Sequence, residues 1–142
     1  MIEFLSKSDI SQILDLYDGN FSDGWNQNML ESAFLNGRFL AIAKRIEQRL
    51  VAVITISTTQ FDADIEGIVV DSAFRNKGYA KELLVFSENH LKNLGVEKIF
   101  LEVRASNTPA RNLYSQNGYN EISIRKKYYS DNEDAVVMAK EI

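Results

Sequence analysis

The feature that most restricts the fold of this chain is a strand, a polar loop and a helix that follow one another in its middle. Residues 63–70 are mainly apolar and β-branched, as in a strand, and residues 71–78 form a polar loop that contains a glycine. The next helix is expected to bury one face, and Gly95 lies where a helix commonly ends. That face consists of Ala80, Leu83, Leu84, Ser87, Leu91 and Leu94. The unit predicts an α/β layered domain, and its loop is where a phosphate ligand is expected to bind.

Shorter strands and helices fill the rest of the 142 residues. Strands are predicted at residues 2–5, 38–45, 49–57, 98–103, 119–124 and 135–139, with a hairpin turn at residues 46–48. Further helices are predicted to begin at Ser8 or Asp9, at Asn26 and at Asn107, since these side chains can cap them, and Pro109 suits a first helical turn. The expected order is β-α-α-β-β-β-α-β-α-β-β, in one domain over residues 1–142 with a central, partly antiparallel sheet.

The composition argues against several classes of protein. No cysteine is present, so disulfides and a thiolate nucleophile are excluded, and with His90 as the one histidine a metal site is not expected. The net charge of −4 disfavours nucleic-acid binding but suits a basic partner. No stretch approaches the ~18 apolar residues of a membrane span. No signal peptide is seen either, so we expect no membrane contact and a cytoplasmic location.

The loop before the long helix has the chemistry of an anion site. Residues 75–80 read Arg-Asn-Lys-Gly-Tyr-Ala. Gly78 can adopt backbone conformations that are closed to other residues, and its missing side chain lets an anion approach. The helix that follows presents free N–H groups and the positive end of its dipole, while Arg75 and Lys77 add positive charge. A plain strand-to-helix turn closed by one glycine is the alternative interpretation of this segment alone.

With its surroundings, this loop is similar to the acetyl-CoA motif of the GCN5-related N-acetyltransferase (GNAT) family. Arg75, Gly78 and Ala80 occupy the three defined positions of that motif, Q/R-x-x-G-x-G/A. Other segments resemble the ribosomal-protein-alanine N-acetyltransferases within the family, whereas residues 35–61 match weakly. These segments are residues 21–25, 101–107, 113–114, 117–119, 124–129 and 133–139, together with Ala110, while residues 69–84 carry the resemblance to the acetyl-CoA motif of the whole family.

The resemblance implies a GNAT-like single domain with a mixed central sheet flanked by helices on both faces, and acetyl-CoA as cosubstrate without a metal. It places the phosphates of acetyl-CoA on the backbone of residues 75–80, and the thioester oxygen on a backbone N–H near the end of the preceding strand. It also gives Asn107 a contact with CoA, next to its expected role as a helix cap. The implied cofactor-binding residues are Ile68, Val69, Val70, Arg75, Asn76, Lys77, Gly78, Tyr79, Ala80 and Asn107.

The implied reaction is attack of a neutral amine on a thioester, which needs a base for the amine proton and an acid for the leaving thiolate. Glu102 lies between Leu101 and Val103 in a strand that reads as central, where a carboxylate without a purpose is costly. It matches the family's general base, although the same alternation fits a solvated strand face. Tyr114 matches the family's general acid, because a phenol with a pKa of about 10 keeps its proton, and its alternative role is core packing.

The acceptor is expected to be the N-terminal amine of a basic protein. Such an amine has a pKa of about 8, against about 10.4 for lysine, so it is the easier nucleophile at neutral pH. The resemblance favours the N-terminal alanine of a small-subunit ribosomal protein. A lysine side chain, a polyamine or another small amine is the alternative acceptor. A third interpretation, from another class, is a non-catalytic acyl-CoA-binding module.

Charged and aromatic residues outside the motifs bear on the acceptor. Tyr128 and Tyr129 are expected to wall a peptide groove, whereas His90 and the basic run 125–127 are expected at the solvated surface. A set of carboxylates before the phosphate loop is a candidate to attract a basic acceptor, with a solvated acidic face as the alternative. The set consists of Asp18, Asp23, Asp62, Asp64 and Glu66.

Overall fold

The strands and helices follow one another in the predicted order in the computed structural model, which describes residues 1–20 and 25–142. The strands are β1 (Ile2–Phe4), β2 (Phe39–Ile46), β3 (Arg49–Thr58), β4 (Asp62–Val70), β5 (Lys98–Arg104), β6 (Asn120–Arg125) and β7 (Ala135–Glu141). The helices are α1 (Ile10–Asn20), α2 (Gln27–Leu35), α3 (Tyr79–Asn93) and α4 (Thr108–Gln116). Two short 3-10 turns, η1 (Lys7–Asp9) and η2 (Ser72–Phe74), precede α1 and the phosphate loop.

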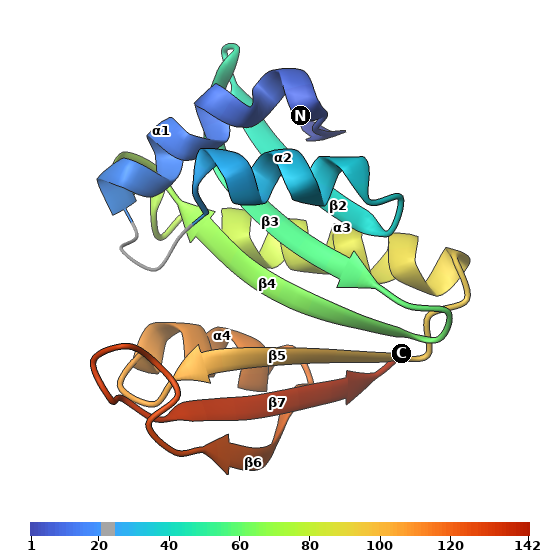
Figure 1. Ribbon diagram of the computed structural model, residues 1–142, viewed down its shortest axis with the longest axis vertical. Coiled ribbons are helices and arrows are strands. Elements are labelled where there is room, and N and C mark those ends of the chain that lie inside the picture. The colour runs from blue at the N-terminus through green and yellow to red at the C-terminus, as the bar shows by residue number, and fades with distance from the viewer. Residues whose placement is uncertain (21–24) are drawn as a thin grey trace.

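The strands form one mixed sheet in the order β1-β2-β3-β4-β5-β7-β6 (Figure 1). Neighbouring strands pair antiparallel from β1 to β4 and again from β5 through β7 to β6. Strands β4 and β5 pair in parallel at the middle of the sheet, from Asp62 opposite Lys98 to Ile65 opposite Leu101. Beyond that register the two strands diverge, and Figure 1 shows the sheet opening between them.

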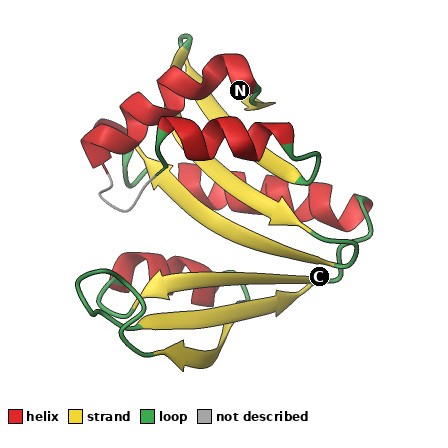
Figure 2. Cartoon of the chain, in the orientation of Figure 1, coloured by secondary structure: helices red, strands yellow, loops and turns green. Residues whose placement is uncertain are grey.

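Helices cover both faces of the sheet, as predicted (Figure 2). On one face, α1 and α2 bury Ile13 and Leu30 against Val53 and Val69 of the central strands. On the other face, α3 and α4 pack on β2–β5 and β7 in a second core, which includes Leu83, Leu84, Leu91, Ile99, Leu101, Tyr114 and Met138. The α1 and α2 layer ends over β4, so the corresponding face of β5 and β7 carries no helix (Figure 1).

Local sequence signals explain most element boundaries. Asn26 and Asn107 cap α2 and α4 by accepting from the backbone N–H of Met29 and Ala110, at 2.8 and 3.2 Å. The entry to α1 differs from the prediction, because the cap lies earlier: the Asp9 carboxylate accepts from the backbone N–H of Ser6 at 2.8 Å, and a 3-10 turn precedes the helix.

Two predictions for this part of the chain need comment. Leu94, expected on the buried face of α3, is 56% exposed, because it is the C-cap residue and lies past the last helical turn. The aromatic-rich segment 21–25 lies outside the described residues except for Trp25, whose ring packs on Phe39 with 5.4 Å between the ring centroids.

Candidate functional site

A cleft of about 470 Å³ lies where β4 and β5 part. Its walls come from segments far apart in the sequence: Asp64 and Glu66 from β4, Phe100 and Glu102 from β5, Arg125 from β6, and Tyr128 and Tyr129 from the loop between β6 and β7. The cleft therefore spans the point after Ile65 and Leu101 where the two strands stop pairing, and it includes the paired residues Asp64 and Phe100.

Glu102 is the carboxylate at the point where the pairing ends. Its neighbours Leu101 and Val103 are 2% and 5% exposed in the core, so its own side chain projects to the opposite, helix-free face. One carboxylate oxygen, Oε1, lies 3.2 Å from the Arg125 Nε. The other, Oε2, is buried and has no hydrogen-bond partner among the described residues. Glu102 is thus not a solvated surface residue, and one of its two oxygens lacks a hydrogen-bond partner among the described residues.

The cleft is acidic. Burial raises the pKa of the Asp64 carboxyl above its usual range, and the negative charges of Glu66 and Glu102 raise it further. The Ser57 hydroxyl donates to Glu66 Oε1 at 2.8 Å and fixes that side chain. The arrangement favours a cationic ligand such as an alkylammonium ion, since a cation would relieve the repulsion between these carboxylates.

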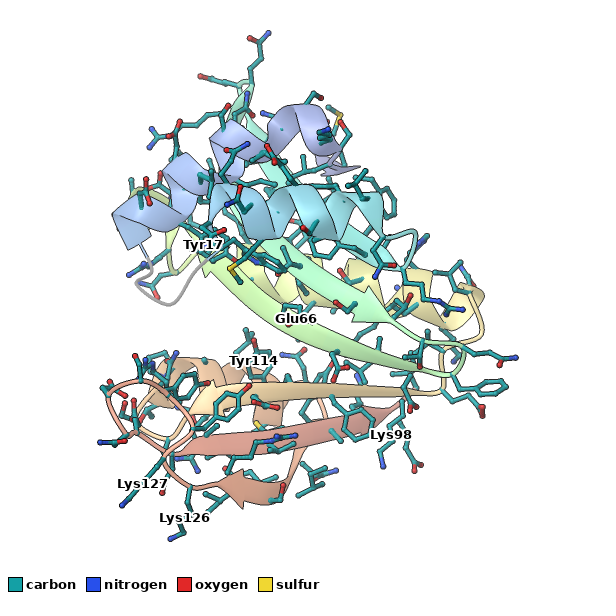
Figure 3. All side chains as sticks on the ribbon, viewed as in Figure 1. Tyr17, Glu66, Lys98, Tyr114, Lys126 and Lys127 are labelled. Atoms are coloured by element: carbon teal, nitrogen blue, oxygen red, sulfur yellow. The ribbon has the colours of Figure 1, made fainter. Side chains whose placement is uncertain are left out.

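Tyr114, on α4, approaches the opening between β4 and β5 from the opposite face of the sheet. Figure 3 shows it between β4 and β5, across from Glu66. It is 6% exposed, and its ring packs edge-on against Tyr119 at 5.7 Å between centroids. Burial raises the pKa of the Tyr114 phenol well above its usual range, with smaller contributions from Tyr17 and Tyr129. Both expected roles are therefore compatible, because the ring belongs to the core while the phenol stays protonated.

The last residues of β4 supply free backbone groups. The Asp71 N–H donates to the Val51 carbonyl at 2.8 Å, and hydrogen-bonded pairs alternate along an antiparallel ladder. Val69 opposite Val53 is therefore a hydrogen-bonded pair, whereas Ile68 and Val70 turn their N–H and C=O groups away from β3 towards the opening. In agreement, the Val70 carbonyl accepts from the Arg75 Nε at 3.2 Å. Of the three predicted donors, Ile68 and Val70 face the opening and Val69 does not.

The phosphate loop has the expected backbone geometry. Asn76 and Gly78 both have positive φ values, of 63° and 81°, and Gly78 is the N-cap of α3. Glycine offers no side-chain cap, and the first helical bond runs from the Glu82 N–H to the Gly78 carbonyl. The N–H groups of Tyr79, Ala80 and Lys81 therefore lack acceptors within the helix, as an anion site requires.

Asp71 fixes the start of the loop, a role that its position in the sequence did not indicate. Asp71 accepts from the backbone N–H of Ala73 at 2.9 Å and from the Arg49 guanidinium at 2.7 Å. These bonds hold the pKa of the Asp71 carboxyl below its usual range. The exposed side chains of Lys77 and Arg75 flank the N-terminus of the helix.

The loop between β6 and β7 is held by Arg104, two residues after Glu102. The Arg104 guanidinium donates to Asp131 at 2.8 Å and to Glu133 at 2.9 Å, and it stacks on the Tyr129 ring at 4.1 Å. A hydrogen bond with Glu102 and the negative charge of that carboxylate raise the pKa of the neighbouring Tyr128 phenol above its usual range. The two tyrosines line the cleft, as predicted, but the arginine that orients the loop was missed.

Several sequence predictions on charged residues need correction. Arg125 is the last residue of β6 and not part of a turn, and although its side chain is 58% exposed, as expected, it pairs with Glu102. His90 is half-buried rather than fully exposed, with its ring 4.8 Å from that of Phe4. Of the acidic set, Asp64 and Glu66 line the cleft, whereas Asp18 and Asp62 do not and Asp23 lies outside the described residues.

The described part of the chain lacks two features, a cluster of metal-binding side chains and a membrane-spanning helix. Residues 1–20 and 25–142 contain no group of three or more His, Cys, Asp or Glu side chains placed to hold a metal ion. In the same ranges, no helix has the length and apolar character to cross a membrane.

Comparison with known proteins identifies relatives over the whole chain. The [Ribosomal protein bS18]-alanine N-acetyltransferase of Haemophilus ducreyi is 32% identical over 143 residues, which cover 98% of each chain. The enzyme with the same name from Escherichia coli K12 is 40% identical over 81 residues, or 55% of each chain. The crystal structure of the ribosomal-protein-S18-alanine N-acetyltransferase from Escherichia coli superposes with a TM-score of 0.94, at 29% identity, and covers 100% of this chain and 93% of that one.

Structures with bound ligand share the fold at lower identity. A GNAT family acetyltransferase from Elizabethkingia anophelis with acetyl-CoA bound has a TM-score of 0.80 at 16% identity and covers 100% of this chain and 97% of that one. The sequence pattern of the Acetyltransferase (GNAT) family matches residues 10–119. That match, together with a relative that is 32% identical over nearly the full length of both chains, shows that this chain belongs to the GNAT family of acetyltransferases.

Proposed function

We propose that this chain transfers the acetyl group of acetyl-CoA to the N-terminal alanine of the ribosomal protein bS18, in the cytoplasm. The names of its relatives support the acceptor, and the similarity to the Haemophilus ducreyi protein covers 98% of this chain. The observation that carries the proposal is the opening between β4 and β5, which combines free backbone N–H groups on one wall with Glu102 at its closed end.

Acetyl-CoA fits the residues along the opening. The N-terminus of α3, with Gly78 at its cap and Arg75 and Lys77 beside it, has the free N–H groups and the positive charge that a pyrophosphate needs. The backbone of Asn76, Tyr79 and Ala80 completes this cradle. Asn107, whose side-chain oxygen already caps α4, would contact CoA from the opposite side of the opening.

Glu102 would take the proton from the acceptor amine. Its Oε2 is buried and has no hydrogen-bond partner among the described residues, so its lone pairs are free to accept a proton, whereas Oε1 is engaged with Arg125. A base is required because an ammonium has no lone pair, and at neutral pH most of an α-amine with a pKa of about 8 is protonated. The acceptor ammonium would be drawn in by Asp64 and Glu66 at the same end of the cleft.

The negative charge that develops on the thioester oxygen would be held by a backbone N–H of Ile68 or Val70. Such a donor, fixed in place before the reaction, can stabilise the transition state by ~3 kcal/mol. Tyr114 would give its proton to the leaving thiolate and prevent its return. Its buried phenol is neutral across the working range of pH and faces the same opening.

The test is turnover on defined acceptors. The chain is incubated with acetyl-CoA and peptides that begin with Ala, Ser, Met or Gly, and with a blocked peptide that carries an internal lysine, and mass spectrometry locates the acetyl group. The proposal expects modification of the α-amine, fastest for Ala. Transfer to the internal lysine at a comparable rate would contradict the acceptor assignment, and an absence of turnover on every amine would favour a non-catalytic acyl-CoA-binding module.

A further inference from the structure

Arg125 differs from the two lysines that follow it. Lys126 and Lys127 extend away from the opening (Figure 3), whereas Arg125 lines the cleft. Its Nε lies 3.2 Å from Glu102 Oε1, and its guanidinium stands 5.6 Å from the centre of the Tyr128 ring. The guanidinium thus contacts both the carboxylate and the aromatic wall beside it.

Among the described residues that line the cleft, Arg125 carries the single positive charge, and the other charged residues are carboxylates. The groups that face Glu102 are the carboxylates of Asp64 and Glu66 on β4 and the phenols of Tyr128 and Tyr129 on the β6–β7 loop. The nearby Arg104 is engaged with Asp131 and Glu133. A single guanidinium therefore offsets the repulsion among three carboxylates in one cleft.

The two oxygens of Glu102 are not equivalent. Oε1 is held by Arg125, while Oε2 is buried and has no partner among residues 1–20 and 25–142. A carboxylate fixed through one oxygen cannot turn freely, so the lone pairs of the other keep one direction. That is the condition a general base must meet to accept a proton from a bound amine.

We propose that Arg125 is a positioning residue for the reaction: its guanidinium holds Glu102 Oε1 and leaves Oε2 for the proton of the acceptor amine. The proton moves from the amine nitrogen to Oε2, and Arg125 keeps its own protons throughout. The inference rests on the proposed function, in which Glu102 is the base.

The test compares Arg125→Met with Lys126→Met, which removes the same charge one residue further along, from an exposed side chain. For an Ala-starting basic peptide, Arg125→Met should lower kcat at least about 10-fold, since a misplacement of about 1 Å can cost up to ~10²-fold. The KM for that peptide should not rise, because the cleft becomes more negative, and the Kd for acetyl-CoA should stay the same. Lys126→Met should stay within about 2-fold in kcat, and Arg125→Lys should recover part of the loss.

A double-mutant cycle separates positioning from a general structural effect. In the Glu102→Gln background, Arg125→Met should lower kcat by less than about 2-fold, because the base that it positions is gone. Thermal unfolding should change little, since the Arg125 side chain is 58% exposed and an ion pair with a solvated partner contributes little to stability. An equal 10-fold loss in both backgrounds, or an equal loss for Lys126→Met, would overturn the positioning role while Glu102 stays the base. A wild-type rate for Glu102→Gln itself would overturn the base assignment in the proposed function, and the positioning role with it.

Discussion

Gly78 gives a direct test of the phosphate site, because α3 has a matching glycine at its other end. Gly78 precedes the helix with a φ of 81°, and Gly95 follows it with a φ of 93°. A Cβ built at either position meets no atom within 4 Å, so the two sites have similar space and similar backbone strain. Only Gly78 lies at the N-terminus of the helix, where the phosphates would bind.

The cost in stability should be alike for Gly78→Val and Gly95→Val. A β-branched residue at such a φ costs about 1–3 kcal/mol. For a chain of this length that lowers Tm by roughly 3–10 °C, and the protein stays folded, because domains are stable by about 5–15 kcal/mol. Differential scanning calorimetry would check this expectation for both variants.

The cost in binding should differ between the two. The valine side chain at position 78 would stand where the pyrophosphate approaches the N–H groups of Tyr79 and Ala80. Losing one charge-assisted hydrogen bond costs about 1.5–3 kcal/mol, which raises the Kd for acetyl-CoA by roughly 10- to 100-fold. Gly95→Val should leave the Kd within about 2-fold of the wild type in isothermal titration calorimetry. A wild-type Kd for folded Gly78→Val would refute the phosphate site, whereas an equal loss of affinity in both variants would assign the effect to strain in the helix.

Three further predictions concern the cleft. Glu102→Gln should lower kcat by ~10²-fold at pH 7, and part of the activity should be recovered near pH 9–10, where an α-amine is already neutral. A wild-type rate at pH 7, in an assay limited by chemistry, would mean that Glu102 has a structural role only. Tyr114→Phe should lower kcat by a similar ~10²-fold at every pH from about 7 to 10, because burial raises the pKa of the phenol and keeps it protonated over that range. A decrease in kcat that disappears at high pH would contradict the acid role. For a basic Ala-starting peptide, kcat/KM should fall as salt rises, and substituting Asp64 by Asn together with Glu66 by Gln should flatten that slope.

Much of the fold could be predicted because its signals are local. The Asn26 and Asn107 caps need only a polar side chain before a helical pattern, and the structure shows both. The turn at Glu47 and Gln48, with positive φ at both residues, follows from two β-rich runs separated by a short polar stretch. The error at the start of α1 is also local, since Ser6, Ser8 and Asp9 are all good capping residues and spacing alone does not choose between them.

The site could be predicted only in part, because it depends on where strands stop pairing. Alternation along β5 indicated that Glu102 points away from Leu101 and Val103, but it did not tell solvent from cleft. The answer comes from β4, which leaves β5 after Ile65, and from Arg125, which lies 23 positions further along the chain. No periodicity in the sequence indicates that such residues lie together. The sequence alone therefore predicts only a solvated turn at residues 125–127.

The positions of the acidic residues of β4 also could not be predicted from their spacing in the sequence. One of them provides a control for the salt experiment. Asp62 and Glu66 are four positions apart on one strand, yet they lie at opposite ends of the β4–β5 pairing. Asp62 is opposite Lys98 at the paired end and does not line the cleft, whereas Glu66 lies beyond the last pair and does. Attraction of a basic acceptor should therefore come from the carboxylates that line the cleft, Asp64 and Glu66. Asp62→Asn should leave the salt dependence of kcat/KM unchanged for basic and neutral peptides alike. A slope that flattens as much for Asp62→Asn as for the Asp64 and Glu66 variant would mean that overall charge, and not the cleft, steers the acceptor.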